Sequence, residues 1–397
     1  MALSAVRSRG ARRAEDTNED DRHGRLRPDI TGTFPSYKSA FGRQNLRIKS
    51  AFADISSPPH VSLQTLSKSL GLSISTVSRA LNGYADVSQA TRQRVNEAAK
   101  AMNYQPNPAA HRLATGRTGA VALVSAVRPG QALDPTFATL QAGAAAVLRE
   151  HGYFVLSMTL PAGDGELPEL ERLLAARLVD GVMLTRTHTL DLRVKLLQAA
   201  GVPFVTHGRT QNPQQHAWVD TDNEEAFYIV TRRLIELGHR RIGFINGPLS
   251  MTYAVLREAG FDRACRESAG VTATTGHVQD VTARNGEEMM REWLAAGLPP
   301  TAVVCATDAL AFGAMAACKA AGLKIGPDIS ITGYGNTEAS AFVDPPLTTI
   351  DHATEANGGH LADLLLQAIA GVTSPALQRL EPVHLLERAS VCPVSKP

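Results

Sequence analysis

The sequence predicts an α/β protein in which a small all-α helix-turn-helix domain and a short linking helix precede a core of two doubly wound parallel-sheet subdomains. Two observations lead to this prediction. Residues 61–117 combine helical patterns with an excess of basic side chains. From Gly119 onward, short apolar and partly β-branched runs alternate with amphipathic helical patterns, which is typical of buried parallel strands joined by crossover helices. About seven such units are too many for one ordinary sheet, so two subdomains are expected.

Composition indicates a multidomain protein of the cytoplasm. The chain has 397 residues, of which 44% are hydrophobic and 20% are charged, and it is too long for one ordinary domain. No apolar run approaches the roughly 18 residues of a membrane span, and the first residues lack the apolar stretch of a secretory signal. The cysteines share no close spacing, so neither a metal site nor a disulfide framework is expected. They are Cys265, Cys305, Cys318 and Cys392. No cofactor and no membrane partner are expected.

Residues 1–60 are expected to be a disordered N-terminal extension. Charged residues, Gly, Pro and Ser alternate there with few aliphatic side chains, so the segment cannot bury enough surface to fold alone. One alternative is a basic arm that touches DNA through arginines such as Arg7 and Arg9. Another is a start of translation near Val61.

Residues 61–106 are predicted to form the helix-turn-helix domain. A leucine repeat at helical spacing marks the first helix, which Gly71 can end. Ser73 and Ser88 can cap the second and third helices. Seven basic residues against two acidic ones over 61–117 give a positive local charge that suits phosphate binding. The expected core residues are Leu63, Leu66, Leu70, Val77, Leu81, Val95, Ala98, Ala99 and Met102.

The outer face of the second helix carries small and hydrogen-bonding side chains and no acidic residue. Its hydroxyls suit phosphates or base edges, Ile74 can meet a thymine methyl, and Arg79 can fork onto a guanine. An ordinary solvated face is the alternative. Downstream, Asn107 and Pro108 can begin a helix of barely two turns, whose Leu113 fits a wedge in the minor groove. A linker that packs Leu113 on its own domain is the alternative there.

The segments LSISTVSRALNG, VSQATRQRV and NYQPNPAAHRLATGRTG, followed by the α/β core, closely resemble the LacI/GalR family of transcriptional regulators from about Val61 to Ala389. The phrases LATGRTGAVALV and THGRT resemble its α-glucoside-type members. The resemblance implies that the second helix lies in the major groove, and that a hinge helix and linker at 107–117 insert Leu113 into the central base step. The DNA-binding residues that it implies are Ser73, Ile74, Ser75, Thr76, Ser78, Arg79, Asn82, Tyr104, Asn107, Ala110 and Leu113.

Residues 119–390 are expected to form a periplasmic-binding-protein-like core that binds an effector and dimerises. Ligands of open α/β sheets collect beyond the carboxyl ends of the strands, and polar groups there beside an aromatic face suit a sugar. For each such residue, a turn or a helix cap is the alternative. The family resemblance adds Tyr253 and Arg257 as effector contacts, whereas Gly335 and Asn336 depart from the acidic pair of many relatives. The full set of expected effector residues is Phe137, His207, Asp222, Tyr253, Arg257, Thr307 and Asp308.

The resemblance implies a sequence-specific repressor of sugar-utilisation genes that binds palindromic operator double-stranded DNA as a homodimer and releases it when a sugar effector is bound. A corepressor that tightens DNA binding is the alternative sign of control. No leucine heptad follows Leu386, which favours a dimer over a tetramer. A sugar-binding transport protein would share the core but not residues 61–117. An enzyme is not expected, because no G-x-S-x-G, P-loop, H-E-x-x-H or strand-following G-x-G-x-x-G motif is present.

Overall fold

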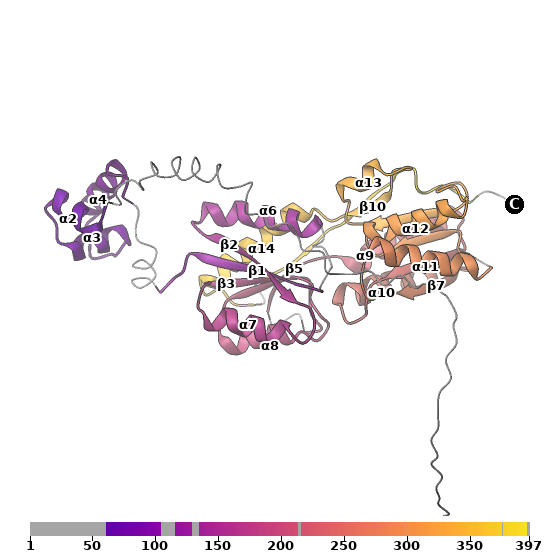
Figure 1. The fold of residues 1–397 in the computed structure, drawn as a ribbon, viewed down its shortest axis with the longest axis horizontal. Helices are drawn as coiled ribbons and strands as arrows, with labels where there is room; N and C mark the ends of the chain where they lie inside the picture. Colours follow the sequence, from indigo (N-terminus) through magenta and orange to yellow (C-terminus); the bar gives the residue numbers. More distant parts are fainter. Residues whose placement is uncertain are drawn as a thin grey trace, which may run out of the picture. The chain divides into compact units, whose positions relative to one another are not determined.

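The chain divides into two compact units between Gln105 and Pro106. The computed structural model describes residues 61–104, 116–128, 135–212, 216–297, 299–374 and 376–394, and Figure 1 shows the elements that they form. The expectations for residues 1–60 and for Asn107, Ala110 and Leu113 of the hinge lie outside the described residues.

Each helix that the structure describes in the first unit, from residue 61 to residue 104, is capped by a serine. The hydroxyls of Ser62, Ser73 and Ser88 accept hydrogen bonds from the backbone N–H three residues further on, which satisfies a group that the helix leaves unpaired. Gly71 ends the first helix in the left-handed conformation, with φ of 63°. The predicted caps at Ser73 and Ser88 and the stop at Gly71 are therefore confirmed. The helices are α2 (Leu63–Leu70), α3 (Ile74–Leu81) and α4 (Gln89–Ala101).

The three helices enclose one small apolar core. Leu66, Val77 and Val95 are completely buried in it. The other predicted core residues are buried with them or pack against them, so the helical spacing in the sequence identified the inner faces correctly. The Arg94 guanidinium donates to the Leu70 carbonyl (2.7 Å), which ties α4 to the end of α2.

The second unit contains two six-stranded sheets, each in its own subdomain. All pairs of neighbouring strands are parallel except β10 and β12. In the order of the first sheet, the strands are β11 (Gln378–Glu381), β5 (Ala217–Thr221), β4 (Phe204–His207), β3 (Gly181–Leu184), β1 (Ala120–Val127) and β2 (Phe154–Pro161). The second sheet follows the order β12 (His384–Leu386), β10 (Thr348–Asp351), β9 (Ser330–Tyr334), β8 (Ala302–Cys305), β6 (Arg241–Asn246) and β7 (Thr272–His277).

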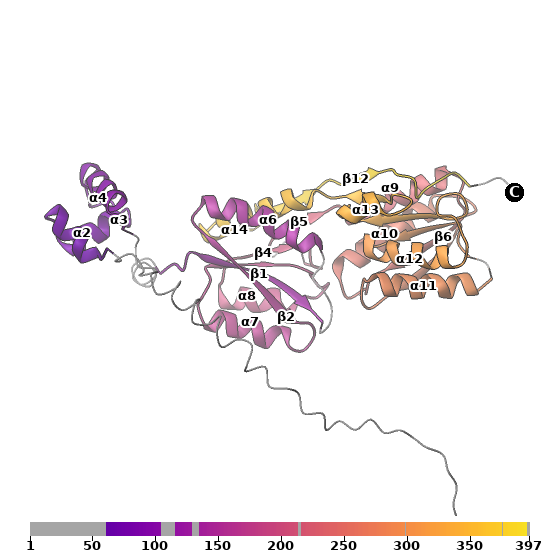
Figure 2. The same ribbon diagram turned by 45° about the horizontal axis from the view of Figure 1, so that its top comes forward.

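Helices cover both faces of the first sheet, as Figure 2 shows. Successive β1 residues alternate between the two layers: Val121 packs toward one helix pair and Ala122 toward the other. Strands buried on both faces read as continuous apolar runs, which is why the sequence pattern identified them. One pair is α6 (Pro135–Glu150) with α14 (Thr354–Ile369), and the other is α7 (Glu166–Ala175) with α8 (Leu192–Ala200).

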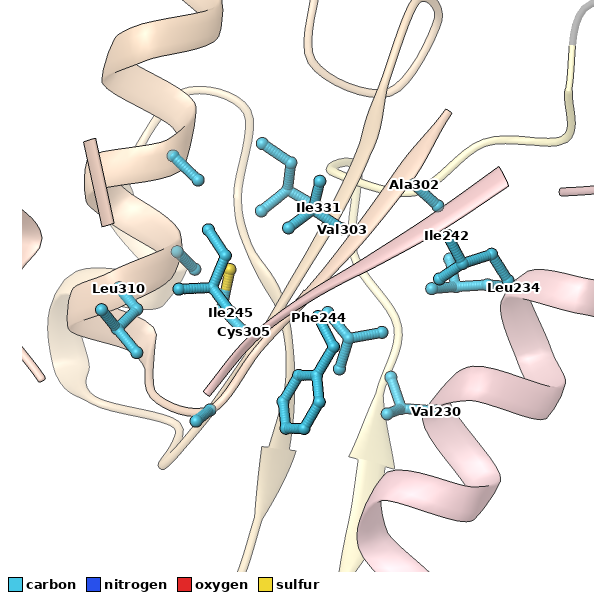
Figure 3. Close-up of a cluster of buried hydrophobic side chains, with 14 of the residues drawn as sticks. Val230, Leu234, Ile242, Phe244, Ile245, Ala302, Val303, Cys305, Leu310 and Ile331 are labelled. Atoms are coloured by element: carbon cyan, nitrogen blue, oxygen red, sulfur yellow. The ribbon is translucent and has the colours of Figure 1, made fainter. Parts of the chain in front are cut away.

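The second sheet is also covered on both faces. In Figure 3, Phe244 points toward Val230 of α9, whereas Ile245 and Cys305 point toward Leu310 of α12. The doubly wound core of two subdomains is therefore confirmed. Its helices are α9 (Asn223–Glu236), α10 (Thr252–Arg266), α11 (Ala283–Ala295), α12 (Asp308–Ala320) and α13 (Glu338–Phe342). Within the described ranges, none of the helices has both the length and the apolar character to cross a membrane.

The chain passes between the two sheets at three places. It does so between β5 and α9, between β10 and α14, and between β11 and β12. The first and the third of these crossings lie side by side, since the Asp222 amide donates to the Glu381 carbonyl (3.0 Å). These crossings place the carboxyl ends of strands from both sheets around one region between the subdomains.

Candidate functional site

A cavity of about 170 Å³ lies between the two subdomains of the second unit, at the carboxyl ends of their strands. Both subdomains contribute polar side chains to it, and the second also contributes aromatic rings. Residues of the first subdomain at the cavity are Thr136, Arg186, Thr187, His207, Gly208, Arg209, Asp220 and Thr221. Residues of the second subdomain and of the crossing after β10 are Asn223, Thr252, Tyr253, Arg257, Val281, Thr307, Tyr334, Gly335 and His352.

Arg257 of α10 supplies a buried positive charge. Its Nε donates to Asn223 Oδ1 (2.8 Å) and its Nη1 donates to the Ala306 carbonyl. No carboxylate in the described part of the chain forms an ion pair with it. Aromatic faces stabilise the cation instead, so its charge stays available to a ligand. The guanidinium carbon lies 3.7 Å from the ring centre of Tyr334, 4.6 Å from that of Tyr253 and 5.3 Å from that of Phe227.

Asp220 connects two arginines across the cavity wall. One of its carboxylate oxygens accepts from Arg209 Nε (2.8 Å), and the other accepts from Asn223 Nδ2 (3.1 Å). Asn223 in turn accepts from Arg257. Because Asp220 is the second-last residue of β5 and Asn223 begins α9, this hydrogen-bonded series spans the first crossing between the subdomains.

Two histidines at the cavity are neutral at physiological pH. Burial, with the nearby His207 and Arg257, lowers the pKa of His352 to about 3. Burial also lowers the pKa of His207. A neutral imidazole offers one donor and one acceptor, which matches a ligand hydroxyl. The hydroxyl of Tyr334 lies 2.8 Å from that of Thr221, which links the second subdomain to the first beside these rings.

Four predicted effector residues meet at this cavity: His207, Tyr253, Arg257 and Thr307. Phe137 does not line it. Its ring is buried in the core beneath α6 and borders a smaller adjoining cavity of about 110 Å³.

The two carboxylates of the predicted effector set, Asp222 and Asp308, do not line this cavity. Asp222 caps α9 by accepting from the Glu225 amide (3.1 Å) and does not line the cavity. Asp308 is 1% exposed, and its oxygens accept from Thr337 and from the Thr349 hydroxyl (2.6 Å). Both carboxylates satisfy groups of the protein itself: Asp222 accepts from the first turn of its own helix, and Asp308 accepts from two other segments of the second subdomain.

Sequence reasoning missed several residues that line the cavity, among them Asp220, Asn223, Tyr334 and His352. Asp220 and Tyr334 lie at the ends of their strands. Asp220 comes two positions before the predicted Asp222, and Tyr334 comes one position before Gly335. The usable signal was the position of a polar or aromatic side chain inside the end of an apolar strand, rather than after it.

The outer face of α3 is the candidate nucleic-acid interface of the first unit. Ser73, Ser75 and Arg79 are exposed, and Ile74 is 47% exposed although it is apolar. The other predicted residues of this face, Thr76, Ser78 and Asn82, are half-buried. The predicted contact Tyr104 is also half-buried and packs against the helical core.

Arg79 is held in place by two neighbours. Its guanidinium pairs with Asp86 (2.5 Å) and lies over the Tyr84 ring, 5.2 Å from the ring centre. Both members of the ion pair are about half exposed, so the pair contributes only about 0–1 kcal/mol. A phosphate or a base edge can therefore replace Asp86 at little cost.

Comparison with known proteins gives two family matches. Residues 62–107 match bacterial regulatory proteins of the lacI family, and residues 231–391 match a periplasmic binding protein-like domain. The transcriptional regulator AglR of Rhizobium meliloti is 38% identical over 341 residues, which cover 84% of this chain and 95% of the relative. The regulator CelR of Thermobifida fusca is 34% identical over 333 residues, which cover 83% and 97%.

Among solved structures, the chain is also similar to transcriptional regulators. A complex of the transcriptional regulator CelR with cellobiose matches with a TM-score of 0.64 and 33% identity, covering 83% of this chain and 99% of that chain. A lac repressor dimer bound to operator and an anti-inducer matches with a TM-score of 0.71 and 28% identity, covering 84% and 99%.

Proposed function

This chain belongs to the lacI family of bacterial transcriptional regulators, and from that premise we propose that it represses sugar-utilisation genes and is released from its operator by a sugar. In this proposal a homodimer presents two copies of α3 to a palindromic site. The effector occupies the cavity between the subdomains of the second unit.

The chemistry of the cavity carries the sugar assignment. Arg257 supplies a buried cation with no carboxylate partner in the described part of the chain, and His207 and His352 supply neutral donor and acceptor groups. The Tyr253 and Tyr334 rings add apolar faces. Sugars present hydroxyls at their edges and C–H groups on their faces, so such a mixture suits them. The cellobiose complex of the relative CelR supports the same ligand class.

The face of α3 supports the DNA assignment. Ile74 is an exposed apolar side chain beside exposed hydroxyls, and Arg79 is oriented by partners that it can leave at little cost. Apolar contact with a thymine methyl and bidentate contact with guanine are the readouts that these side chains allow. Ser73, Ser75, Thr76, Ser78 and Asn82 complete the proposed DNA-contacting set, with Tyr104 and the hinge residues Asn107, Ala110 and Leu113.

Contacts at the edge of the cavity support the coupling between ligand and DNA. Two backbone hydrogen bonds and one ion pair join the subdomains there, so a ligand held by both subdomains favours the arrangement that keeps these contacts. Any such preference acts reciprocally on DNA affinity. The pairs are Thr252 N with Thr187 O (3.1 Å), Thr189 N with Ser250 O (2.9 Å), and Arg128 with Asp280 (3.1 Å).

The test is a gel shift of the full chain on DNA upstream of its neighbouring genes, repeated across a panel of mono- and disaccharides. We expect a palindromic site to be retained in preference to random duplex, and one sugar to release it. A sugar that strengthens retention would reverse the proposed sign of control. No preference for any site, or no response to any sugar, would refute the proposal.

A further inference from the structure

Two short segments from different subdomains pair with each other at the edge of the effector cavity. Residues 187–189 lie between β3 and α8 of the first subdomain, and residues 250–252 lead from β6 into α10 of the second. They pair as neighbouring antiparallel strands do, and we call this pairing the inter-subdomain bridge. Thr187 and Thr252 also line the cavity. The pairs are His188 with Met251, Thr189 N with Ser250 O (2.9 Å), and Thr252 N with Thr187 O (3.1 Å).

Arg193 of α8 fixes the first half of the bridge. Its side chain is 2% exposed and does not line the effector cavity. Its Nη2 donates to the carbonyl of Arg186 (2.8 Å), whose φ of +55° is uncommon for a residue with a side chain. Its Nε and Nη2 also donate to Asp191 (2.9 and 2.6 Å), which in turn accepts from the His188 amide (3.0 Å). Arg193 therefore holds the backbone on both sides of Thr187.

Glu166 of α7 adds a second buried carboxylate to this cluster. Its Oε2 lies 3.1 Å from Nη1 of Arg193, as an ion pair without hydrogen-bond geometry. Burial raises the pKa of Asp191, but the hydrogen bonds and the positive charge of Arg193 lower it further, to below its usual value. Taking charged groups out of water is costly, and apolar side chains often fill such a core as stably. An apolar side chain, however, cannot hold the Arg186 carbonyl or orient Asp191.

Asn246 fixes the second half of the bridge in the same way. It is the last residue of β6 and is completely buried. Its Nδ2 donates to the Ala254 carbonyl (2.9 Å), and its Oδ1 accepts from the Gly247 amide (2.8 Å). The Met251 amide then closes the loop by donating to the Pro248 carbonyl (2.9 Å). Each half of the bridge is thus held by a buried polar side chain of its own subdomain.

The bridge leads directly into groups that line the cavity. Thr252 begins α10, which carries Tyr253 and Arg257. We infer that Arg193 is a positioning residue for the effector site: it holds residues 187–189 in the conformation that pairs with residues 250–252, and so sets how firmly the two subdomains are joined at the cavity. It acts without touching the ligand. In its consequence for the effector, this inference rests on the proposed function.

Amide hydrogen exchange of the full chain tests this positioning without a ligand. Arg193→Met is combined with Glu166→Gln, because Glu166 would otherwise be a buried carboxylate without its cation. We expect the Thr252 amide, which belongs to the other subdomain, to exchange about tenfold faster than in Glu166→Gln alone. Leu197→Ala is the matched control for destabilisation of α8, because Leu197 is completely buried and does not line the cavity. It is expected to leave the Thr252 amide unchanged.

Arg193→Lys guards against misfolding of the combined variant. It keeps the positive charge in the cluster, but a single ammonium does not reproduce the fork that joins the Arg186 carbonyl to both carboxylates. The Thr252 amide is therefore expected to exchange faster in this variant as well. An unchanged rate at Thr252 in the folded Arg193 variants would overturn the inference.

Calorimetric titration with maltose, cellobiose and raffinose tests the consequence for the effector. Thr252→Pro removes the amide of the bridge at the first position of α10, where proline is tolerated, and the preceding Met251 is already extended (φ −91°, ψ 132°). Thr252→Val keeps this amide and is the matched control. We expect the Arg193 substitution to weaken binding of the best-bound sugar about five- to tenfold beside Thr252→Val, and less than about twofold beside Thr252→Pro, in which the bridge is already lost.

Equal losses in the two backgrounds would overturn the inference, because Arg193 would then act on the effector without the bridge. If none of the sugars binds the unaltered chain, the proposed function fails. Exchange of the Thr252 amide then still decides whether Arg193 positions the bridge.

Discussion

The guanidinium carbon of Arg257 lies 3.7 Å from the centre of the Tyr334 ring, whose hydroxyl lies 2.8 Å from that of Thr221. Arg257 and Tyr334 belong to the second subdomain, whereas Thr221 ends β5 of the first. Burial raises the pKa of Tyr334, so its phenol stays protonated at neutral pH. One ring therefore supports the cation of the cavity and joins the subdomains.

Replacing Arg257 by methionine is expected to weaken sugar binding by about 1.5–3 kcal/mol, the usual contribution of hydrogen bonds to a charged group. DNA binding without sugar is expected to persist, since the substitution leaves α3 untouched. Calorimetric titration measures the first effect and fluorescence anisotropy on operator DNA measures the second.

The matched control is Arg263→Met on the same helix. Arg263 pairs with Glu224 and Glu225 at the surface and does not line the cavity, so sugar affinity is expected to stay unchanged. Equal losses in the two variants would mean that general destabilisation of α10, and not the cavity cation, sets the affinity.

Arg79→Met is expected to weaken binding to the operator by about 1–3 kcal/mol while affecting random duplex less, because a base contact carries sequence information and a phosphate contact does not. Anisotropy titrations with both duplexes at one salt concentration measure the difference. Asp86→Asn is the control, since it frees Arg79 from its ion pair without removing it. A uniform loss on both duplexes would assign Arg79 to the phosphate backbone.

Local patterns in the sequence were sufficient to predict the helices of the first unit and the layers of helices and strands in the second. Serine caps and leucine spacing act within a few residues, so Ser73 and Ser88 could be identified without tertiary information. The strands at the edges of the sheets were harder to predict from the sequence. The apolar runs from Gly119 onward predicted buried strands, yet Phe154 of β2 is 77% exposed because this strand lies at the edge of the sheet. The edge strand β7 has the sequence TATTGH, which is no apolar run, so the same pattern does not predict it.

The residues that line the cavity between the subdomains could be predicted only in part, for a related reason. Which strand-end residue faces the cavity depends on the pleat of the strand and on where the chain crosses to the other subdomain. Asp220 and Asp222 would lie on the same face of a continuous strand, because they are two residues apart. However, β5 ends at Thr221 and the chain turns into α9. Asp222 therefore becomes a cap, and Asp220 becomes part of the wall.

This difference predicts opposite effects for two neighbouring carboxylates. Asp222→Ala is expected to cost about 0.5–2 kcal/mol of stability through the lost cap and to leave sugar affinity unchanged. Asp220→Asn is expected to weaken sugar binding, because an amide keeps only one acceptor oxygen and no negative charge, so Arg209 and Asn223 can no longer both donate to this side chain. Thermal melting and calorimetric titration of both variants separate the two roles. A loss of sugar affinity in Asp222→Ala would restore the original assignment of this residue.

The buried His352 predicts an acid-sensitive second unit. Its pKa is about 3 in the folded chain and about 6.5 when unfolded, so the unfolded state binds the proton more strongly between these values. The contribution of His352 to the free energy of unfolding is fully present above pH 6.5. It is lost as pH falls toward 3, by about 1.4 kcal/mol per pH unit. His352→Gln has no such proton, so its urea midpoint is expected to fall less between pH 7.5 and pH 5.5. The lowered pKa values of His207, His216 and His239 leave a shared residual slope in both proteins. Identical slopes in the two proteins would show that His352 accepts a proton in the folded state.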